Sequence, residues 1–171
     1  ATAEYGGVIS TYAAPIVTLT GCTFKNNTSA TYGGAFGTMN SATYCGAVVT
    51  MTDCVFENNT SGTAGGAIRL ARATATLTNC TFTGNTAGSF GDDICISGSQ
   101  MALTLAGTTS AADLEIYDDE AVTIKIAEGA SGAIDLSFTT QTMHEKHYAD
   151  AETPLPLFAG DGFAAAYAAG K

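Results

Sequence analysis

The chain has 171 residues, of which 46% are hydrophobic and 13% charged, whereas about 25% of the residues in an average soluble domain are charged. Six Lys and Arg residues against sixteen Asp and Glu residues give a net charge of -10, which argues against nucleic acid as a partner because phosphate binding relies on Lys and Arg clusters. No apolar run of the sequence approaches the roughly 20 residues that span a bilayer, so we expect no direct membrane insertion of this segment. Because the chain begins at Ala1 rather than Met, we expect it to be a processed product or a piece of a longer protein.

The composition also favours β-structure over helices. Solvent-facing helices need Glu, Lys and Arg on one side, and these residues are scarce. Twenty glycines stand among many threonines, and these two residue types suit tight turns and strands respectively. The length fits one domain or one segment of a solenoid.

Three similar segments follow one another along the chain, at residues 17–29, 49–61 and 75–87. Each contains Thr-x-Thr, then a cysteine, then Phe-x-x-Asn, and each follows a glycine pair that begins at Gly6, Gly33 or Gly65. A degenerate fourth glycine motif begins at Gly91, and the steps between glycines are 27, 32 and 26 residues. A period in the twenties with short alternating strands is typical of a solenoid whose units stack on a continuous core.

The alternation within each unit predicts which side chains point inward. Stacked in register, equivalent inward residues would form columns with a spacing of roughly 4.8 Å. The amides of an asparagine column can hydrogen-bond along the stack, and we expect the cysteine column to be free, buried thiols that fill the core rather than a disulfide or metal site. The predicted columns are Phe24, Phe56 and Phe82; Asn27, Asn59 and Asn85; and Cys22, Cys54 and Cys80. Cys45 and Cys95 lie off this column, and their pairing stays open.

Crossovers between parallel strands are nearly always right-handed. The predicted fold is therefore an all-β, right-handed parallel β-helix of about six to seven rungs.

The second unit carries an insertion. Its glycine pair and its cysteine are 21 residues apart, against 16 and 15 in the first and third units, so about five extra residues lie between Gly34 and Cys54. We place them in a bulge within residues 37–46. Solenoids bind partners through extended faces and such insertions, which makes Asn40, Thr43 and Tyr44 the candidate binding residues.

Beyond Gly107 the motif fades but alternation continues at 114–116, 122–126 and 134–138, with about 20 residues per turn. We therefore divide the chain into repeats at 1–107, divergent shorter rungs at 108–140, and a terminal rung or cap at 141–171. Most of the negative charge lies beyond the repeats.

The pairing of Gly-Gly-Ala-Ile at 65–68 with Phe-x-x-Asn motifs ending at Asn27, Asn59 and Asn85 resembles the polymorphic outer membrane protein repeats of chlamydial autotransporters, which also occur in large surface proteins of other bacteria. The resemblance covers about residues 6–95. It implies a non-enzymatic adhesin passenger at the bacterial cell surface or secreted outside the cell, with a host-surface protein or glycan as partner. A stalk that displays a binding loop is an alternative, as is a purely structural stalk without a ligand. The oligomeric state stays open.

Pectate lyases and many glycosidases share this fold, so the main enzymatic alternative is a lyase or hydrolase acting on acidic carbohydrate. Such sites need clustered carboxylates, either as an acid and base pair or as calcium ligands. The two clusters of the sequence are 92–93 and 118–120, which we interpret mainly as solvated turns. Asp92, Asp93, Asp118 and Asp119 are weak calcium candidates, and no other cofactor is expected.

The Thr-x-Thr pairs at 18–20, 50–52 and 76–78 predict a flat grid of hydroxyl and methyl groups on one face. This grid resembles the ice-binding face of β-solenoid antifreeze proteins, which makes ice binding a minor alternative. Strand propensity by itself also selects threonine on an exposed sheet.

Overall fold

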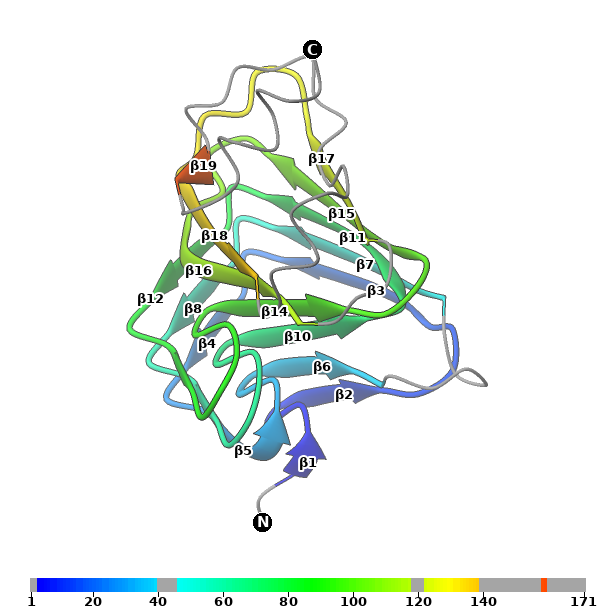
Figure 1. The fold of residues 1–171 in the computed structure, drawn as a ribbon, viewed down its shortest axis with the longest axis vertical. Coiled ribbons are helices and arrows are strands. Elements are labelled where there is room, and N and C mark those ends of the chain that lie inside the picture. The colour runs from blue at the N-terminus through cyan, green and yellow to red at the C-terminus, as the bar shows by residue number, and fades with distance from the viewer. Residues whose placement is uncertain (1–2, 40–45, 118–121, 139–157, 160–171) are drawn as a thin grey trace.

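The computed structural model describes residues 3–39, 46–117, 122–138 and 158–159. In these residues the strands stack into four sheets in which every pairing is parallel. Figure 1 shows the successive coils climbing from β1 at the bottom to β17 near the top. The predicted all-β parallel β-helix is confirmed.

We name the four sheets A to D in the order in which the chain first visits them. Sheet A contains β1 (Ala3–Tyr5), β5 (Thr28–Tyr32), β9 (Thr60–Ser61) and β13 (Thr86–Ala87). Sheet B contains β2 (Ile9–Thr11), β6 (Phe36–Thr38), β10 (Ile68–Ala71), β14 (Ile94–Ser97), β16 (Ala111–Ile116), β18 (Ile134–Phe138) and β19 (Phe158–Ala159). Sheet C contains β3 (Ile16–Thr20), β7 (Ala47–Thr52), β11 (Ala73–Thr78), β15 (Met101–Ala106) and β17 (Val122–Ile126), and sheet D contains β4 (Thr23–Lys25), β8 (Val55–Glu57) and β12 (Thr81–Thr83).

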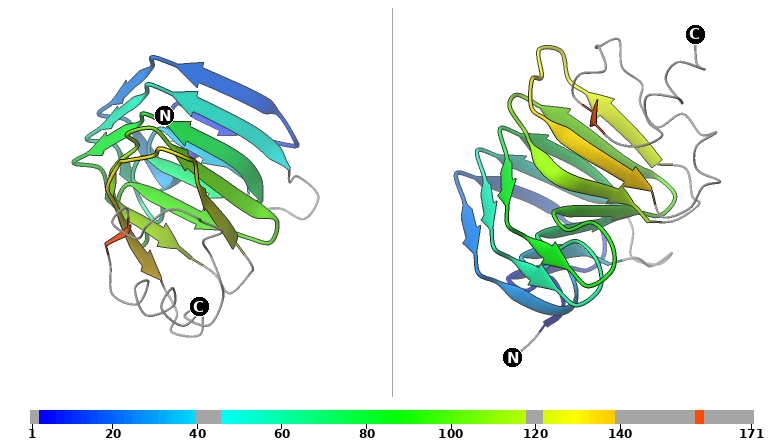
Figure 2. Two further views of the ribbon diagram at one scale, coloured as in Figure 1. Left: turned by 90° about the horizontal axis from the view of Figure 1, so that it is seen from above. Right: turned by 60° about the vertical axis from the view of Figure 1, so that its left-hand side comes forward.

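Each of the first three coils visits all four sheets, and the coils lie one above the other (Figure 2). The inward side chains form continuous columns because the strands pair in register. One column in sheet B aligns Phe36, Ile68, Ile94, Leu114 and Leu136, and all five side chains are buried. The alternation of buried and more exposed residues in β7, β11 and β15 is the pattern predicted from the sequence.

The glycine pairs form the corner between sheets A and B. Gly33 has a φ of 59°, and a Cβ atom on it would lie 2.0 Å from the carbonyl oxygen of Phe36. A Cβ on Gly34 would lie 2.1 Å from the carbonyl oxygen of Gly66 in the next coil. The first glycine therefore permits the turn, and the second permits the next coil to stack closely.

The coils become shorter after β15. Sheets A and D end at β13 and β12 in the described residues, and β16 follows β15 after a short connection. Partners in sheet B are 26 residues apart at Ile68 and Ile94, but only 20 apart at Ile94 and Leu114. The strands expected at 114–116, 122–126 and 134–138 are present. The seven strands described in sheet B agree with about six to seven rungs.

The search of the described residues for a helix long and apolar enough to cross a membrane found none.

Candidate functional site

A stack of three phenylalanine rings runs through the interior behind sheet D. The ring centroids of Phe24 and Phe56 are 5.0 Å apart, and those of Phe56 and Phe82 are 4.8 Å apart. The interplanar angles are 8° and 4°. Parallel pairing fixes this arrangement, since β4, β8 and β12 align these residues directly. The ring positions are therefore a consequence of the coil register.

The three asparagines form a hydrogen-bonded ladder at the corner between sheets D and A. The Nδ2 of Asn27 donates to the Oδ1 of Asn59 at 2.8 Å, and the Nδ2 of Asn59 donates to the Oδ1 of Asn85 at 2.9 Å. The backbone N–H groups of Asn27 and Asn59 donate to the same two oxygens, and Asn59 Nδ2 also donates to the carbonyl of Phe24. Each amide thus holds the corner of its own coil to the next coil.

The cysteine column lies beside the phenylalanine stack. Cys22, Cys54 and Cys80 carry free thiols, and the latter two are buried. The Sγ of Cys54 lies 3.4 Å from the carbonyl oxygen of Thr52, within hydrogen-bonding range for sulfur. Burial raises the pKa of Cys80 to about 11, although a hydrogen bond with the backbone of Cys54 lowers it in part. The buried thiols of Cys54 and Cys80 therefore remain protonated at neutral pH and pack as small apolar groups.

A family-model comparison matches two segments of the chain, residues 21–38 and 53–70. Each segment begins one residue before the cysteine, runs through the strand of sheet D and around the asparagine corner, and ends in the strand of sheet B that follows the glycine pair. This chain carries the Chlamydia polymorphic membrane protein repeat. The predicted resemblance is confirmed, and the repeat is that of a family of polymorphic membrane proteins. No curated protein and no solved structure matches the chain.

The glycine-pair pattern ends at Asp92 and Asp93, for a reason visible in the stacking. Gly66 must lack a side chain because its Cβ would lie 2.1 Å from the carbonyl oxygen of Asp92 in the coil above. The next coil turns directly from sheet C to sheet B, so no glycine pair stacks on Asp92 in the described residues. A side chain is tolerated at this position, and the fourth glycine motif can therefore be degenerate.

Asp93 ends the asparagine ladder. Its Oδ1 accepts a hydrogen bond from Asn85 Nδ2 at 2.9 Å, and its Oδ2 accepts one from the backbone N–H of Ala112 at 2.7 Å. Only 3% of the residue is exposed, so the expectation of a solvated turn is wrong for Asp93. Burial raises the pKa of this carboxyl group, while the hydrogen bonds from Asn85 and Ala112 act in the opposite direction.

Three further carboxylates accept backbone N–H groups at the end of the last full coil. Asp92 Oδ1 accepts from Ala87 at 2.8 Å, Asp113 Oδ2 from Asp92 at 2.8 Å, and Glu115 Oε2 from Gly91 at 2.7 Å. In the coil below, Gly65 donates the equivalent N–H to the carbonyl oxygen of Phe90. The carboxylates therefore replace the carbonyl groups that another full coil would supply.

The structure describes two of the four calcium candidates. Asp92 and Asp93 act as hydrogen-bond acceptors within the fold, and Asp118 and Asp119 lie outside the described residues. Within the described ranges, no group of three or more His, Cys, Asp or Glu side chains is arranged to hold a metal ion.

The corner between sheets B and C carries the insertion. Eight residues, 39–46, separate β6 from β7, whereas Arg72 alone separates β10 from β11. The location expected for the extra residues is confirmed. Asn40, Thr43, Tyr44 and Cys45 lie outside the described residues, so their contacts and geometry are not described.

The threonine grid lies on the outer face of sheet C. Thr18, Thr50, Thr76 and Thr104 are aligned by direct pairing, as are Thr20, Thr52 and Thr78. The first column continues into Lys125, which interrupts the hydroxyl pattern in the fifth strand. The grid is regular over the polymorphic membrane protein repeats and ends beyond them.

Sequence reasoning missed a group of side chains on the outer face of sheet B. Arg69 is 2% exposed there, and its guanidinium carbon lies 4.7 Å from the ring centroid of Tyr32. Two aromatic pairs flank it, Tyr5 with Tyr32 and Phe90 with Tyr117. The available signal was the aromatic residue just before three of the four glycine motifs, at Tyr5, Tyr32 and Phe90.

Proposed function

We propose that the chain is a non-enzymatic part of a bacterial surface or secreted β-helix protein, and that it acts as an adhesin passenger for a host-surface protein or glycan. The polymorphic membrane protein repeat at 21–38 and 53–70 supports the class. The proposed location is the bacterial cell surface or the extracellular space.

The observation that carries this proposal is that the variation in coil length is concentrated at one edge of the solenoid. In the three repeat coils, the corner from sheet C to D and the corner from sheet D to A each contain two residues. The step from the ladder asparagine to the glycine that begins the corner into sheet B is also constant, at six residues in each coil. The corner from sheet B to C contains four residues in the first coil, eight in the second, one in the third and three in the fourth. Core packing fixes the length of the corners from sheet C to D and from sheet D to A. The corner from sheet B to C varies in length, as binding loops on a rigid scaffold do.

This variable edge also exposes apolar side chains among the described residues. Tyr12 is 59% exposed, Ile16 81% and Val48 42%. Ile16 and Val48 are paired neighbours in sheet C, next to the insertion. Exposed apolar residues that cluster beside a variable loop are typical of a protein interaction surface.

A loop deletion tests the proposal. Removing residues 39–43 should abolish adherence of the purified chain to host cells, because the deletion removes Asn40 and Thr43 and displaces Tyr44. The control is Lys25→Gln, which removes an exposed charge of sheet D that pairs with Glu57 at 2.7 Å. Adherence that survives the loop deletion, with the chain still folded by circular dichroism, contradicts the proposal.

A lyase or hydrolase acting on acidic carbohydrate draws less support from the described residues. Its candidate carboxylates at Asp92 and Asp93 accept hydrogen bonds that close the last full coil. The discriminating experiment is an activity screen against acidic polysaccharides with and without calcium. Cleavage products in that screen would favour the enzyme over the adhesin.

A further inference from the structure

We propose that the outer face of sheet B binds an acidic glycan, with Arg69 as the contact for a sugar carboxylate. This inference rests on the proposed function only for its setting at the cell surface. It concerns a different face of the solenoid from the insertion at 39–46.

The first observation is an incompletely satisfied buried cation. Arg69 Nη2 donates to Ser97 Oγ at 2.8 Å, whereas Nε and Nη1 are buried and reach no hydrogen-bond acceptor. Arginine stays charged at any physiological pH, and a buried guanidinium with unpaired donors costs folding free energy. The fold uses Nη2 of this buried cation but neither Nε nor Nη1, which points to an acceptor supplied by a ligand.

The second observation is the aromatic surroundings of this cation. Tyr32, Ala64 and Phe90 are aligned at equivalent positions of successive coils. The aromatic column is interrupted at Ala64. Arg69 belongs to the same coil as Ala64, and its guanidinium contacts Tyr32 of the coil below and Ser97 of the coil above. The cation therefore packs on the Tyr32 ring, in the coil whose own position in the column is occupied by Ala64 rather than by a ring.

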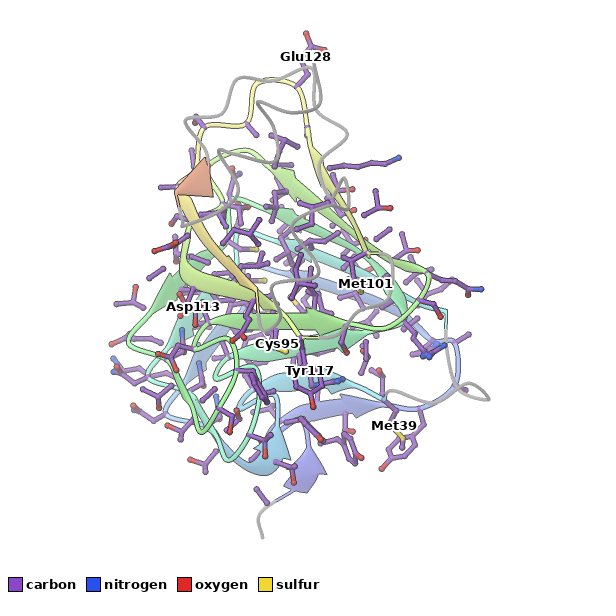
Figure 3. The ribbon with its side chains drawn as sticks, viewed as in Figure 1. Met39, Cys95, Met101, Asp113, Tyr117 and Glu128 are labelled. Carbon is purple, nitrogen blue, oxygen red and sulfur yellow. The ribbon has the colours of Figure 1, made fainter. Side chains whose placement is uncertain are left out.

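The rings provide an extended, partly exposed surface along the solenoid axis. The ring centroids of Tyr5 and Tyr32 are 5.2 Å apart, and those of Phe90 and Tyr117 are 4.4 Å apart. Tyr117 is 38% exposed, and Figure 3 shows it with Cys95 on the face of sheet B turned toward the viewer. Tyr32 and Phe90 are two coils apart, roughly 9.6 Å from the spacing of neighbouring strands.

These features together favour an acidic glycan. Aromatic faces pack against the apolar C–H faces of sugar rings, and the guanidinium matches a carboxylate in geometry and charge. Residues 1–90 contain three acidic and three basic side chains. The acidic side chain aligned with Arg69 on this face, Glu115, lies two coils above it and accepts a hydrogen bond from the Gly91 N–H at 2.7 Å. The flexible stem of Arg69 allows its head to turn from Tyr32 toward the ligand.

Calorimetric titration of the full chain tests this assignment. The probes are oligogalacturonate, hyaluronan oligosaccharide and polysialic acid, each compared with its carboxyl methyl ester. We expect at least one acidic probe to bind, and its ester to bind about tenfold more weakly or worse because the charge-assisted hydrogen bonds are lost. Arg69→Gln should weaken binding of the acidic probe by a similar factor. The matched control Lys125→Gln removes the same charge from sheet C and should leave the affinity unchanged.

Several outcomes overturn the proposal. They are failure of all three acidic probes to bind, equal binding of acid and ester, and equal loss in Arg69→Gln and Lys125→Gln. Equal binding of polyglutamate would assign the site to acidic peptides instead.

A second variant separates binding from folding. Arg69→Met keeps a long side chain without the charge, and it should unfold at the same or a higher urea concentration than the wild type. Much earlier unfolding would make Arg69 a structural residue and overturn the proposal. Deletion of residues 39–43 should leave glycan binding intact, so failure of this site and failure of the proposed adhesion edge give different results.

Discussion

The repeat coils and the shorter coils above them solve the same hydrogen-bonding problem with different side chains. In the repeats, one amide ladder joins Asn27, Asn59 and Asn85, and each corner supplies the acceptor for the corner below. Where sheets A and D end, carboxylates from Asp92, Asp93, Asp113 and Glu115 accept the remaining N–H groups. Neutral amides suit a stack of identical neighbours because an amide both donates and accepts, whereas a carboxylate suits its end because it only accepts.

This difference explains how charge is distributed along the chain. Residues 1–90 contain three of the sixteen acidic residues, and thirteen follow residue 90. Four of these thirteen are the carboxylates that close the last full coil. The acidic excess is therefore in part a structural requirement of ending a repeat, rather than a general surface property.

The largest expected effect comes from placing a side chain inside the repeat stack. Gly66→Ala should destabilise the chain by more than about 3 kcal/mol, because the new Cβ would lie 2.1 Å from the Asp92 carbonyl oxygen and 2.6 Å from backbone atoms of Thr86. The measurement is urea unfolding followed by circular dichroism.

Asp92 occupies the same place one coil higher and supplies the matched control. Asp92→Ala should cost only about 1 kcal/mol, the value of one lost hydrogen bond to Ala87. Equal costs at Gly66 and Asp92 would contradict the conclusion that the close stacking ends between these two coils.

Removing the central amide of the ladder should have the next largest effect. Asn59→Ala should cost about 3 kcal/mol, because the N–H group and Nδ2 of Asn27 lose their acceptor and the Phe24 carbonyl loses a donor. Asn27→Ala, at the partly exposed start of the ladder, should cost about 1 kcal/mol. Urea unfolding of both variants checks the order, and an equal loss would mean that the ladder does not act through its buried centre.

Much of the repeat region could be predicted from the sequence, because identical coils repeat their own signal. The columns of phenylalanine, asparagine and cysteine depend only on period and alternation, both of which are visible in the residues. The role of Asp93 could not be predicted, because it follows from the absence of a full coil above it. The contacts of Arg69 with Tyr32 and Ser97 could not be predicted either, since those residues lie 37 and 28 positions away in the sequence. The aromatic residues before the glycine motifs signalled the rings but not the cation that contacts them.

The carboxylate end of the ladder should differ from its amide body in its response to pH. Burial raises the pKa of Asp93 above the usual value for the unfolded chain. The Asp93 carboxyl group therefore binds its proton more tightly in the folded chain than in the unfolded chain. Its contribution to stability is greatest below its pKa in the unfolded chain and decreases as the pH rises through its pKa in the folded chain. Relative to Asp93→Asn, the wild type should gain stability on acidification from about pH 7 to about pH 4.

Urea unfolding of the two proteins across this pH range measures the difference, in which the other titrating groups cancel. A relative loss of wild-type stability on acidification would mean that the hydrogen bonds from Asn85 and Ala112 outweigh the desolvation of Asp93.

The smallest expected effect is on the rate of thiol alkylation at the boundary between the repeat coils and the shorter coils, not on stability. Cys80 lies in the last repeat coil, where its backbone N–H donates to Thr109 Oγ1 of the first shorter coil at 3.2 Å. With a pKa raised to about 11, roughly one thiol in a thousand is ionised at about pH 8. Iodoacetamide should therefore modify the partly exposed Cys22 much faster than Cys80 in the folded chain.

Thr109→Gly should accelerate the modification of Cys80 and leave the modification rate of Cys22 unchanged, because it removes the side chain that covers this end of the cysteine column. Mass spectrometry of the alkylated peptides measures both rates, and an unchanged rate at Cys80 in Thr109→Gly would show that the repeat coils protect this thiol without help from the coil above.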